Sequence, residues 1–239
     1  FRFEYGSGAG RNLTAIVDTL TGRSLALRYT LNGDVVSITL DESETQFAYN
    51  LQGLLTEITN PSDTTLAYDY DLMGNISVVT LPDETIWQYA YDGNNNLQSA
   101  TNPLGLSTIY TFDELNRIES IIDPLGQIES FSYDGNGNLA TITDTKEIST
   151  LFTYTPMNQV ASITDGAGNI TQYDYDLLGR LDTITQTDAS PETRITYDNN
   201  NNIIAITEQR QRTLYSYDAL GRVTSITDPA GHTTSYEYD

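Results

Sequence analysis

Aromatic residues recur along this chain at a fixed interval, and an aspartate or a close substitute follows almost every one. The clear copies of this dyad are separated by steps of 21, 21, 21, 21, 21, 21, 22, 20 and 21 residues. They begin at Tyr49, Tyr70, Tyr91, Phe112, Tyr133, Tyr154, Tyr175, Tyr197, Tyr217 and Tyr238. A fixed period of this length is the signature of a repeat architecture. Because no linker, charge block or change of composition interrupts the series, residues 1–239 are expected to form one continuous repeat region.

Hydrophobic positions predict two short β-strands in each repeat. The segment before each dyad places aromatic residues two apart, as at Tyr173 and Tyr175, so both lie on one face of a strand. The segment after each dyad places apolar residues three apart, as at Leu181 and Ile184. A spacing of three predicts either a β-bulge or a sheet that is apolar on both faces. Both segments are rich in Thr, Ile, Val, Tyr and Phe, which favour strands.

A first turn begins at the second residue of each dyad. Asp at position i and Gly at i+3 favour a type I turn, in which the Asp side chain accepts backbone N–H groups and Gly adopts a positive φ. Asn, which tolerates the same backbone conformation, replaces that Gly at Asn95, Asn116, Asn158 and Asn201. An Arg after the turn can pair with the Asp or cover an aromatic ring. The residues expected to have these structural roles are Tyr70, Asp71, Gly74, Tyr91, Asp92, Tyr133, Asp134, Gly137, Tyr175, Asp176, Gly179, Arg180, Tyr217, Asp218, Gly221 and Arg222.

A second turn follows ten residues after the first. Asp123-Pro124-Leu125-Gly126 and Asp228-Pro229-Ala230-Gly231 have Asp at i, Pro at i+1 and Gly at i+3, which again favours a type I turn. Asn102-Pro103-Leu104-Gly105 is in phase with them and is interpreted as the same turn.

Two turns and two strands in each repeat of about 21 residues predict an all-β fold, an array of antiparallel β-hairpins. Wide sheets twist and must curl or close, and open terminal strands favour aggregation. We therefore expect the array to coil into a spiral, a tube or a hollow shell.

The chain is strongly acidic, with a formal net charge of −22 from 33 acidic and 11 basic residues. This charge repels phosphate backbones and anionic lipids, so a nucleic-acid partner is not expected. No apolar run approaches the ~20 residues of a membrane-spanning helix, so no membrane span is expected. The absence of cysteine excludes disulfides and thiolate metal sites. The sequence starts and stops within the repeat pattern, and we expect it to be an excerpt of a longer protein.

The sequence predicts no catalytic site. A hydrolytic triad needs a histidine beside a nucleophile, and the single histidine, His232, follows a second-turn glycine, where an exposed turn residue is expected. Paired carboxylates could support glycoside hydrolysis, but 33 acidic residues make chance pairs common. One histidine and no cysteine do not provide the ligands of a zinc site.

Calcium is the one cofactor that the sequence leaves open. Two first turns place oxygen-bearing side chains at alternating positions, as the start of an EF-hand loop does. The candidate ligands are Asp92, Asn94, Asn96, Asp134, Asn136 and Asn138. Neither segment has the Gly at the sixth position or the Glu at the twelfth, and a hairpin turn favours the same residue types. The preferred interpretation is a turn without calcium.

The stretch from Tyr217 to Asp239 resembles the repeat unit of the YD-repeat, or RHS-repeat, family. It contains the dyad Tyr217-Asp218, then Gly221-Arg222, then Asp228-Pro229, and it ends on Tyr238-Asp239. The resemblance covers essentially the whole chain. The family includes Rhs and wall-associated polymorphic toxins, the C components of insecticidal toxin complexes, and teneurins. It implies a long β-sheet that spirals into a hollow shell, which encloses a toxic domain in the toxins and belongs to an adhesion scaffold in teneurins.

These observations together predict a non-catalytic structural scaffold, secreted or at the cell surface. The expected partners are other segments of the same protein, neighbouring copies and an enclosed toxin domain. The leading function is the encapsulating shell of a secreted toxin. The alternative is a cell-surface adhesion protein or a protein that forms filaments or tubes, which the uniform step of 21 residues favours slightly.

Overall fold

The computed structural model describes residues 1–6, 12–187 and 192–239. Within these ranges the regular structure consists of 23 β-strands, with no helix, in antiparallel pairing. The prediction of an all-β array of antiparallel hairpins is confirmed. Contacts between residues divide the chain into two units, Phe1–Gln127 and Ile128–Asp239, which are described separately.

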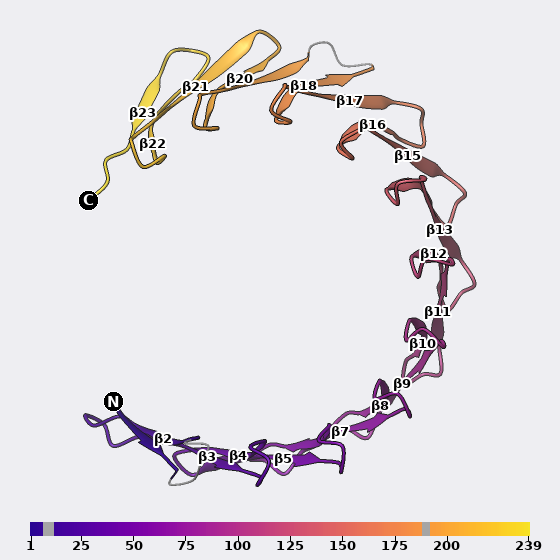
Figure 1. Cartoon of the computed structure of the whole chain (residues 1–239), viewed down its shortest axis with the longest axis vertical. Helices are drawn as coiled ribbons and strands as arrows, with labels where there is room; N and C mark the ends of the chain where they lie inside the picture. Colours follow the sequence, from indigo (N-terminus) through magenta and orange to yellow (C-terminus); the bar gives the residue numbers. More distant parts are fainter. Residues whose placement is uncertain (7–11, 188–191) are drawn as a thin grey trace. The chain divides into compact units, whose positions relative to one another are not determined.

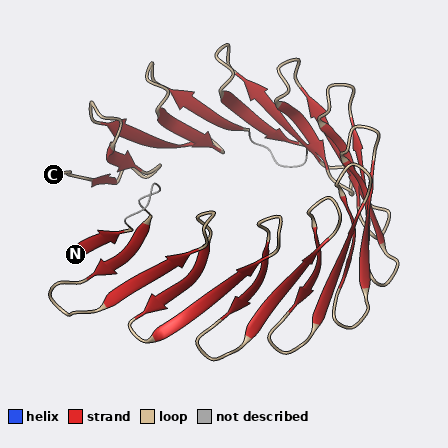
Figure 2. Cartoon of the chain, turned by 60° about the horizontal axis from the view of Figure 1, so that its bottom comes forward, coloured by secondary structure: helices blue, strands red, loops and turns tan. Residues whose placement is uncertain are grey.

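Unit 1 is a single layer of strands in which each strand pairs with the strands next to it in sequence (Figure 1). Because consecutive strands are antiparallel, the first turns lie along one edge of the layer and the second turns along the other (Figure 2). The strands are β1 (Arg2–Tyr5), β2 (Leu13–Val17), β3 (Ser24–Tyr29), β4 (Val35–Leu40), β5 (Ser43–Tyr49), β6 (Leu55–Thr59), β7 (Thr65–Tyr70), β8 (Ile76–Thr80), β9 (Ile86–Tyr91), β10 (Leu97–Thr101), β11 (Ser107–Phe112) and β12 (Ile118–Ile122).

Unit 2 has the same arrangement, again with each strand paired to its sequence neighbours. Its strands are β13 (Ile128–Tyr133), β14 (Leu139–Thr143), β15 (Ser149–Tyr154), β16 (Val160–Thr164), β17 (Ile170–Tyr175), β18 (Leu181–Gln186), β19 (Thr193–Tyr197), β20 (Ile203–Glu208), β21 (Gln211–Tyr217), β22 (Val223–Thr227) and β23 (Thr233–Ser235).

A β-bulge recurs directly after each first turn. In the β17–β18 hairpin, Tyr175 pairs with Leu181 and Asp174 pairs with Thr183, so the residue between Leu181 and Thr183 is extra. The extra residue brings apolar residues that are three apart in sequence back to one face of the strand. Of the two explanations for this spacing, the bulge is therefore correct.

The two faces of the layer have different chemistry. In the β15–β16 hairpin, Phe152 pairs with Ile163 on one face, because residues directly opposite each other share a face. On the other face, the hydroxyl oxygens of Thr153 and Ser162 are 2.7 Å apart and share a hydrogen bond. Aromatic and aliphatic side chains thus line one face, and small hydroxyl side chains are common on the other.

Few residues are fully buried, as a single layer of strands requires. Among the described residues, only Ser37, Thr183 and Ala205 are buried. All three are small residues at the same position of the repeat, two after the first residue of a strand that follows a first turn. The dyad tyrosines from Tyr49 to Tyr217 are half-buried, whereas Tyr238 is exposed. Stability therefore depends on contacts between neighbouring strands and on the hydrogen bonds of the turns.

Candidate functional site

The chemistry-bearing residues that the sequence singled out gather at the first turns. Each expected tyrosine ends a strand: Tyr70 ends β7, Tyr91 ends β9, Tyr133 ends β13, Tyr175 ends β17 and Tyr217 ends β21. The following aspartate opens the turn. Since the first turns share one edge within each unit, these groups form a row of similar sites rather than one central site.

Where the dyad has an aspartate, that residue closes the first turn with its backbone and its side chain. In the turn of Asp176, the Gly179 N–H donates to the Asp176 carbonyl at 2.9 Å, and the Asp176 N–H donates to the Arg180 carbonyl at 2.8 Å. The carboxylate atom Oδ1 accepts the N–H groups of Leu178 at 2.8 Å and Arg180 at 3.0 Å. Gly179 has a φ of 77°. This is a type I turn followed by a residue in the left-handed conformation.

The residue four positions after the aspartate, which we call the capping residue, binds the second carboxylate oxygen. The Arg180 Nε donates to Asp176 Oδ2 at 2.7 Å, and the Asn96 Nδ2 donates to Asp92 Oδ2 at 3.0 Å. The backbone and side-chain bonds from Arg180 lower the pKa of Asp176, and the side-chain bond from Asn96 lowers that of Asp92. Hydrogen bonds to a charged carboxylate favour its ionised form. These carboxylates are therefore held ionised and are unsuited to act as general acids.

Capping residues also link each first turn to the next one along the edge. In unit 1, Asn75 Nδ2 donates to Asn95 Oδ1 at 3.0 Å, and Asn96 Nδ2 donates to Asn116 Oδ1 at 2.9 Å. In unit 2, Arg180 Nη1 donates to Asn201 Oδ1 at 2.8 Å. The acceptor is a side chain of the following repeat in each case. The first-turn edge is thus connected by side chains as well as by the strands.

The six candidate calcium ligands take part in these turn contacts. Asp92 Oδ1 accepts the N–H groups of Asn94 at 2.8 Å and Asn96 at 2.9 Å. Asp134 likewise accepts from Asn136 at 2.9 Å and from Asn138 at 2.8 Å, and the Nδ2 of Asn138 donates to Asp134 Oδ2 at 3.0 Å. Each carboxylate is surrounded by N–H donors, whereas calcium requires converging oxygen atoms. Among the described residues, no three His, Cys, Asp or Glu side chains form a group that could hold a metal.

The dyad tyrosines use their hydroxyl groups to connect neighbouring hairpins. The Tyr175 hydroxyl donates to the carbonyl of Val160, the first residue of β16, at 2.8 Å. Burial raises the pKa of Tyr175, which keeps its hydroxyl protonated as a donor. The same contact joins Tyr29 to Leu13, Tyr49 to Val35, Tyr70 to Leu55, Tyr154 to Leu139, Tyr197 to Leu181, Tyr217 to Ile203 and Tyr238 to Val223.

This hydroxyl contact was not among the sequence-based predictions, although the sequence carries a signal for it. Tyrosine occupies nearly every dyad position, whereas the aromatic position two residues earlier also accepts phenylalanine, as at Phe131 and Phe152. A position that keeps the hydroxyl indicates a hydrogen bond, and a position that exchanges Tyr for Phe indicates packing alone.

The capping arginines Arg180 and Arg222 each form an ion pair and also lie against an aromatic ring. Arg180 forms an ion pair with Asp176 at 2.6 Å, and its guanidinium lies 4.4 Å from the centre of the Tyr197 ring. Arg222 pairs with Asp218 at 2.7 Å and lies 4.5 Å from the centre of the Tyr238 ring. Each of these arginines therefore connects its own turn to an aromatic ring of the next repeat.

His232 lies in a second turn and is exposed. The ring nitrogen Nδ1 of His232 is 3.0 Å from Asp228 Oδ2, and the backbone N–H of His232 donates to Asp228 Oδ1 at 2.8 Å. The side chain occupies the place of a capping residue, as Asn169 does beside Asp165. This contact is a structural one within the turn.

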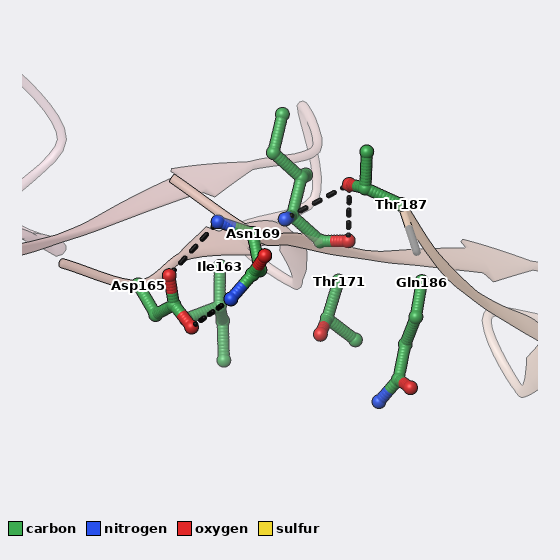
Figure 3. A pocket seen from close by; sticks show the side chains of 7 residues that line it. Ile163, Asp165, Asn169, Thr171, Gln186 and Thr187 are labelled. Atoms are coloured by element: carbon green, nitrogen blue, oxygen red, sulfur yellow. Dashed lines mark hydrogen bonds between the residues drawn. The ribbon is translucent and has the colours of Figure 1, made fainter. Parts of the chain in front are cut away.

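A pocket of about 430 Å³ in unit 2 lies beside β17 and β18 (Figure 3). Asp165 Oδ1 and Oδ2 accept the backbone N–H and the Nδ2 of Asn169, both at 2.8 Å, which lowers the pKa of Asp165. The Thr187 hydroxyl accepts the N–H of Ile170 and donates to its carbonyl, both at 2.9 Å. No histidine or second carboxylate is among the seven described residues that line the pocket. The lining therefore offers no acid–base pair for catalysis.

Comparisons with known proteins agree with the repeat pattern. The Teneurin YD-shell family matches residues 7–110. The RHS Repeat family matches residues 133–170, 158–193, 197–233 and 217–239. The search of curated protein sequences found no match.

Several solved structures share the fold. The Photorhabdus luminescens Tc holotoxin pore matches with a TM-score of 0.53 and 17% identity, covering 100% of this chain and 17% of that chain. The crystal structure of TcdB2-TccC3 matches with a TM-score of 0.53 and 16% identity, covering 99% of this chain and 17% of that chain. TcdB2-TccC3 without its hypervariable C-terminal region gives a TM-score of 0.53 at 17% identity, with 99% and 17% covered.

This chain thus spans about 17% of the length of those chains. At this level of identity the matches show a common fold, and they extend over nearly all of this chain. The described part of the chain also contains no helix able to span a bilayer. The chain belongs to the YD-repeat, or RHS-repeat, family, whose repeats form structural shells.

Proposed function

We propose that this chain is part of the wall of a hollow shell that encapsulates the toxic domain of a secreted toxin. The observation that carries the proposal is the match to Tc toxin structures over 99% to 100% of the chain. In this function the repeats are structural, and no step of a reaction is assigned to them.

The chemistry of the two faces supports a wall. A layer of strands with one aromatic face and one face on which small hydroxyl residues are common presents different surfaces to its two sides. The contacts that hold neighbouring hairpins together, from the Tyr175 hydroxyl or the Arg180 side chain, repeat from one hairpin to the next. Such a layer can be extended by further repeats without a change of local structure.

The strong negative charge limits which partners the proposed wall can bind. A net charge of −22 disfavours binding to nucleic acid or to anionic lipid. The partners we propose are other segments of the same protein, neighbouring copies and an enclosed toxic domain. We place the assembled protein outside the cell or at its surface.

A second candidate function is a cell-surface adhesion protein or a protein that forms filaments or tubes. The match of residues 7–110 to the Teneurin YD-shell favours it. The nearly constant step between dyads also suits a structure that extends along an axis.

Electron microscopy of the complete natural protein that contains this chain tests the proposal. We expect separate closed particles with density inside, and protection of the enclosed domain from added protease until the particle is opened. Long tubes or an open lattice on cells would instead support the second candidate. Closed particles without internal density or a protected domain would overturn the encapsulating function.

A further inference from the structure

Two first turns contain the dipeptide Asn-Gly at their third and fourth positions. One turn starts at Thr30 and contains Asn32-Gly33, and the other starts at Asp134 and contains Asn136-Gly137. Both asparagines are exposed, and both glycines have a positive φ. The chain therefore carries the same reactive dipeptide twice, in two turns of the same kind.

An asparagine that precedes glycine is prone to deamidation, because glycine has no side chain to hinder its backbone nitrogen. In this reaction the glycine nitrogen attacks the side-chain carbon Cγ of the asparagine and closes a five-membered succinimide. The Cγ–Nδ2 bond breaks, and Nδ2 leaves as ammonia after it gains the proton that the glycine nitrogen loses. Water then opens the ring at one of its two carbonyl carbons and gives aspartate or isoaspartate. Water is the only reagent, so the reaction needs no enzyme.

An intact turn opposes this attack. The Gly137 N–H donates to the Asp134 carbonyl at 3.0 Å, and the Gly33 N–H donates to the Thr30 carbonyl at 3.2 Å. The glycine nitrogen must leave this bond before it can reach the neighbouring side chain, so the turn has to open first. The free energy of such local opening differs from one part of a protein to another. The rate of deamidation at each asparagine therefore depends on how firmly its turn is closed.

The turn at Thr30 is closed less firmly than the turn at Asp134. Asp134 Oδ1 accepts the N–H groups of Asn136 at 2.9 Å and Asn138 at 2.8 Å. The Thr30 hydroxyl accepts the two corresponding N–H groups at 3.2 and 3.1 Å. Hydrogen bonds to a charged carboxylate are shorter and roughly twice as strong as neutral ones. Threonine accordingly closes such a turn more weakly than aspartate does.

The capping residue increases this difference. Asn138 Nδ2 donates to Asp134 Oδ2 and to Asn158 Oδ1, each at 3.0 Å, so it supports its own turn and links it to the next one. The Thr30 turn has Asp34 at this position, and the Asp34 carboxylate accepts the Thr30 hydroxyl at 3.2 Å. An ionised carboxylate has no hydrogen to donate to a following turn.

We infer that Asn32 is a site of spontaneous deamidation, and that the Asp134 turn protects Asn136 in the same dipeptide. The product at Asn32 carries an additional negative charge. Isoaspartate also adds one carbon to the backbone of the turn that joins β3 and β4. The positions that bond to each other across this turn then no longer match, so the modification weakens the hairpin.

Peptide mass spectrometry of the complete protein, incubated at neutral pH, tests the inference. The rate at each asparagine is divided by its rate in the same protein unfolded in guanidinium chloride, which corrects for the neighbouring residues. We expect folding to slow the reaction at Asn136 at least about threefold more than at Asn32, because the bonds to the carboxylate are the stronger ones.

Two exchange variants test the cause of the difference. Thr30→Asp together with Asp34→Asn gives the first turn the closing residues of the second, and should slow deamidation of Asn32 to about the rate of Asn136. Asp134→Thr together with Asn138→Asp should accelerate deamidation of Asn136.

Asn95→Gly provides a matched control within unit 1. It gives the turn that starts at Asp92 the same five residues as the Asp134 turn, so Asn94 should then be as well protected as Asn136. The inference is overturned if folding slows Asn32 as much as Asn136, or if the exchange variants keep the rates of the parent. Rapid deamidation of Asn94 in the control variant overturns it as well, because the difference would then lie between the units and not between the turns.

Discussion

At the scale of the single residue, the turns depend on positions with a positive φ. Gly179 has a φ of 77°, and Asn201 has a φ of 69° at the same position of its turn. In second turns, Glu84 and Glu147 take this conformation with φ of 66° and 63°. A residue with a side chain loses about 1–2 kcal/mol there, and glycine does not.

Replacing Gly179 by Val should destabilise the protein by about 1–3 kcal/mol, because a β-branched residue resists a positive φ. A Cβ at Gly179 would be 3.7 Å from the nearest atom, the Gln159 Nε2, so the cost arises in the backbone and not from a clash. Urea unfolding measures the change. Gly93→Val is the control, since Gly93 has no positive φ and open space around it. Equal stability of the parent and Gly179→Val would contradict the turn assignment.

The opposite change should stabilise a second turn. Glu147→Gly removes a side chain from the left-handed conformation and should raise the free energy of unfolding by about 1 kcal/mol, after the entropy cost of glycine. Lys146→Gly, one position earlier and without a positive φ, should not stabilise. Thermal melting of both variants distinguishes the backbone effect from a general effect of glycine.

The backbone conformation of the first turns was largely predictable from the sequence, and that of the second turns was less so. Gly or Asn at the fourth turn position indicates a positive φ, as at Gly179 and Asn201. Glu84 and Glu147 carry no such signal. Their conformation is imposed by the strands that the turn must join, so tertiary structure overrides local preference there.

At the scale of the element, the weaker junction lies between one hairpin and the next. The ladder of β16 and β17 has three register pairs, from Ser162 with Gln172 to Thr164 with Ile170. The ladder of β17 and β18 has five, including the pair beyond the bulge. The Tyr175 hydroxyl binds the Val160 carbonyl where the shorter ladder has ended. The tyrosine therefore extends the junction beyond the backbone ladder.

Removing this hydroxyl should loosen the junction. Tyr175→Phe leaves the ring in place and should lower the free energy of unfolding by about 0.5–1.5 kcal/mol, the usual net value of one hydrogen bond. Tyr173→Phe is the matched control, because phenylalanine occupies the same position of the repeat at Phe131 and Phe152. Urea unfolding compares the two variants, and equal losses would show that the Val160 contact has no special role.

The sequence predicted the elements well and their connections only in part. Aromatic residues two apart correctly predicted the strand before each dyad. The spacing of Leu181 and Ile184 predicted either a bulge or a sheet apolar on both faces, and the structure has the bulge. The contacts of Asn96 with Asn116 could not be derived, because they depend on how far apart neighbouring turns lie. That distance follows from strand pairing and twist, which no single repeat contains.

At the scale of the whole molecule, the net charge of −22 attracts cations in general, so a test for calcium must separate specific binding from charge screening. Asp92 and Asp134 already accept three hydrogen bonds each. We therefore expect EDTA to leave the melting temperature unchanged at constant ionic strength. A fall of several degrees that calcium reverses, and magnesium does not, would establish a calcium site and contradict this expectation.

Acid should destabilise the protein through the turn aspartates. Hydrogen bonds from the capping residues and turn N–H groups lower the pKa of Asp71, Asp92, Asp113, Asp134, Asp165, Asp176, Asp198, Asp218 and Asp228. In the unfolded chain these groups have a pKa of about 3.9. A lowered pKa in the folded state adds stability that is fully present above the unfolded value and is lost as the pH falls through the folded value.

Protonation also relieves repulsion among the many acidic groups, which acts in the opposite direction. High salt screens that repulsion and leaves the short hydrogen bonds of the turns largely intact. In 0.5 M NaCl, a concentration chosen for screening, we expect the melting temperature to fall steadily as the pH is lowered from about 5 towards 2.

Asp134→Asn removes one of these carboxylates and should make that fall less steep. A melting temperature that stays level or rises over this range would show that repulsion, and not the turn hydrogen bonds, dominates the response to acid. The test works because nine similar turns respond together, so an effect too small to see at one exposed carboxylate becomes a property of the whole array.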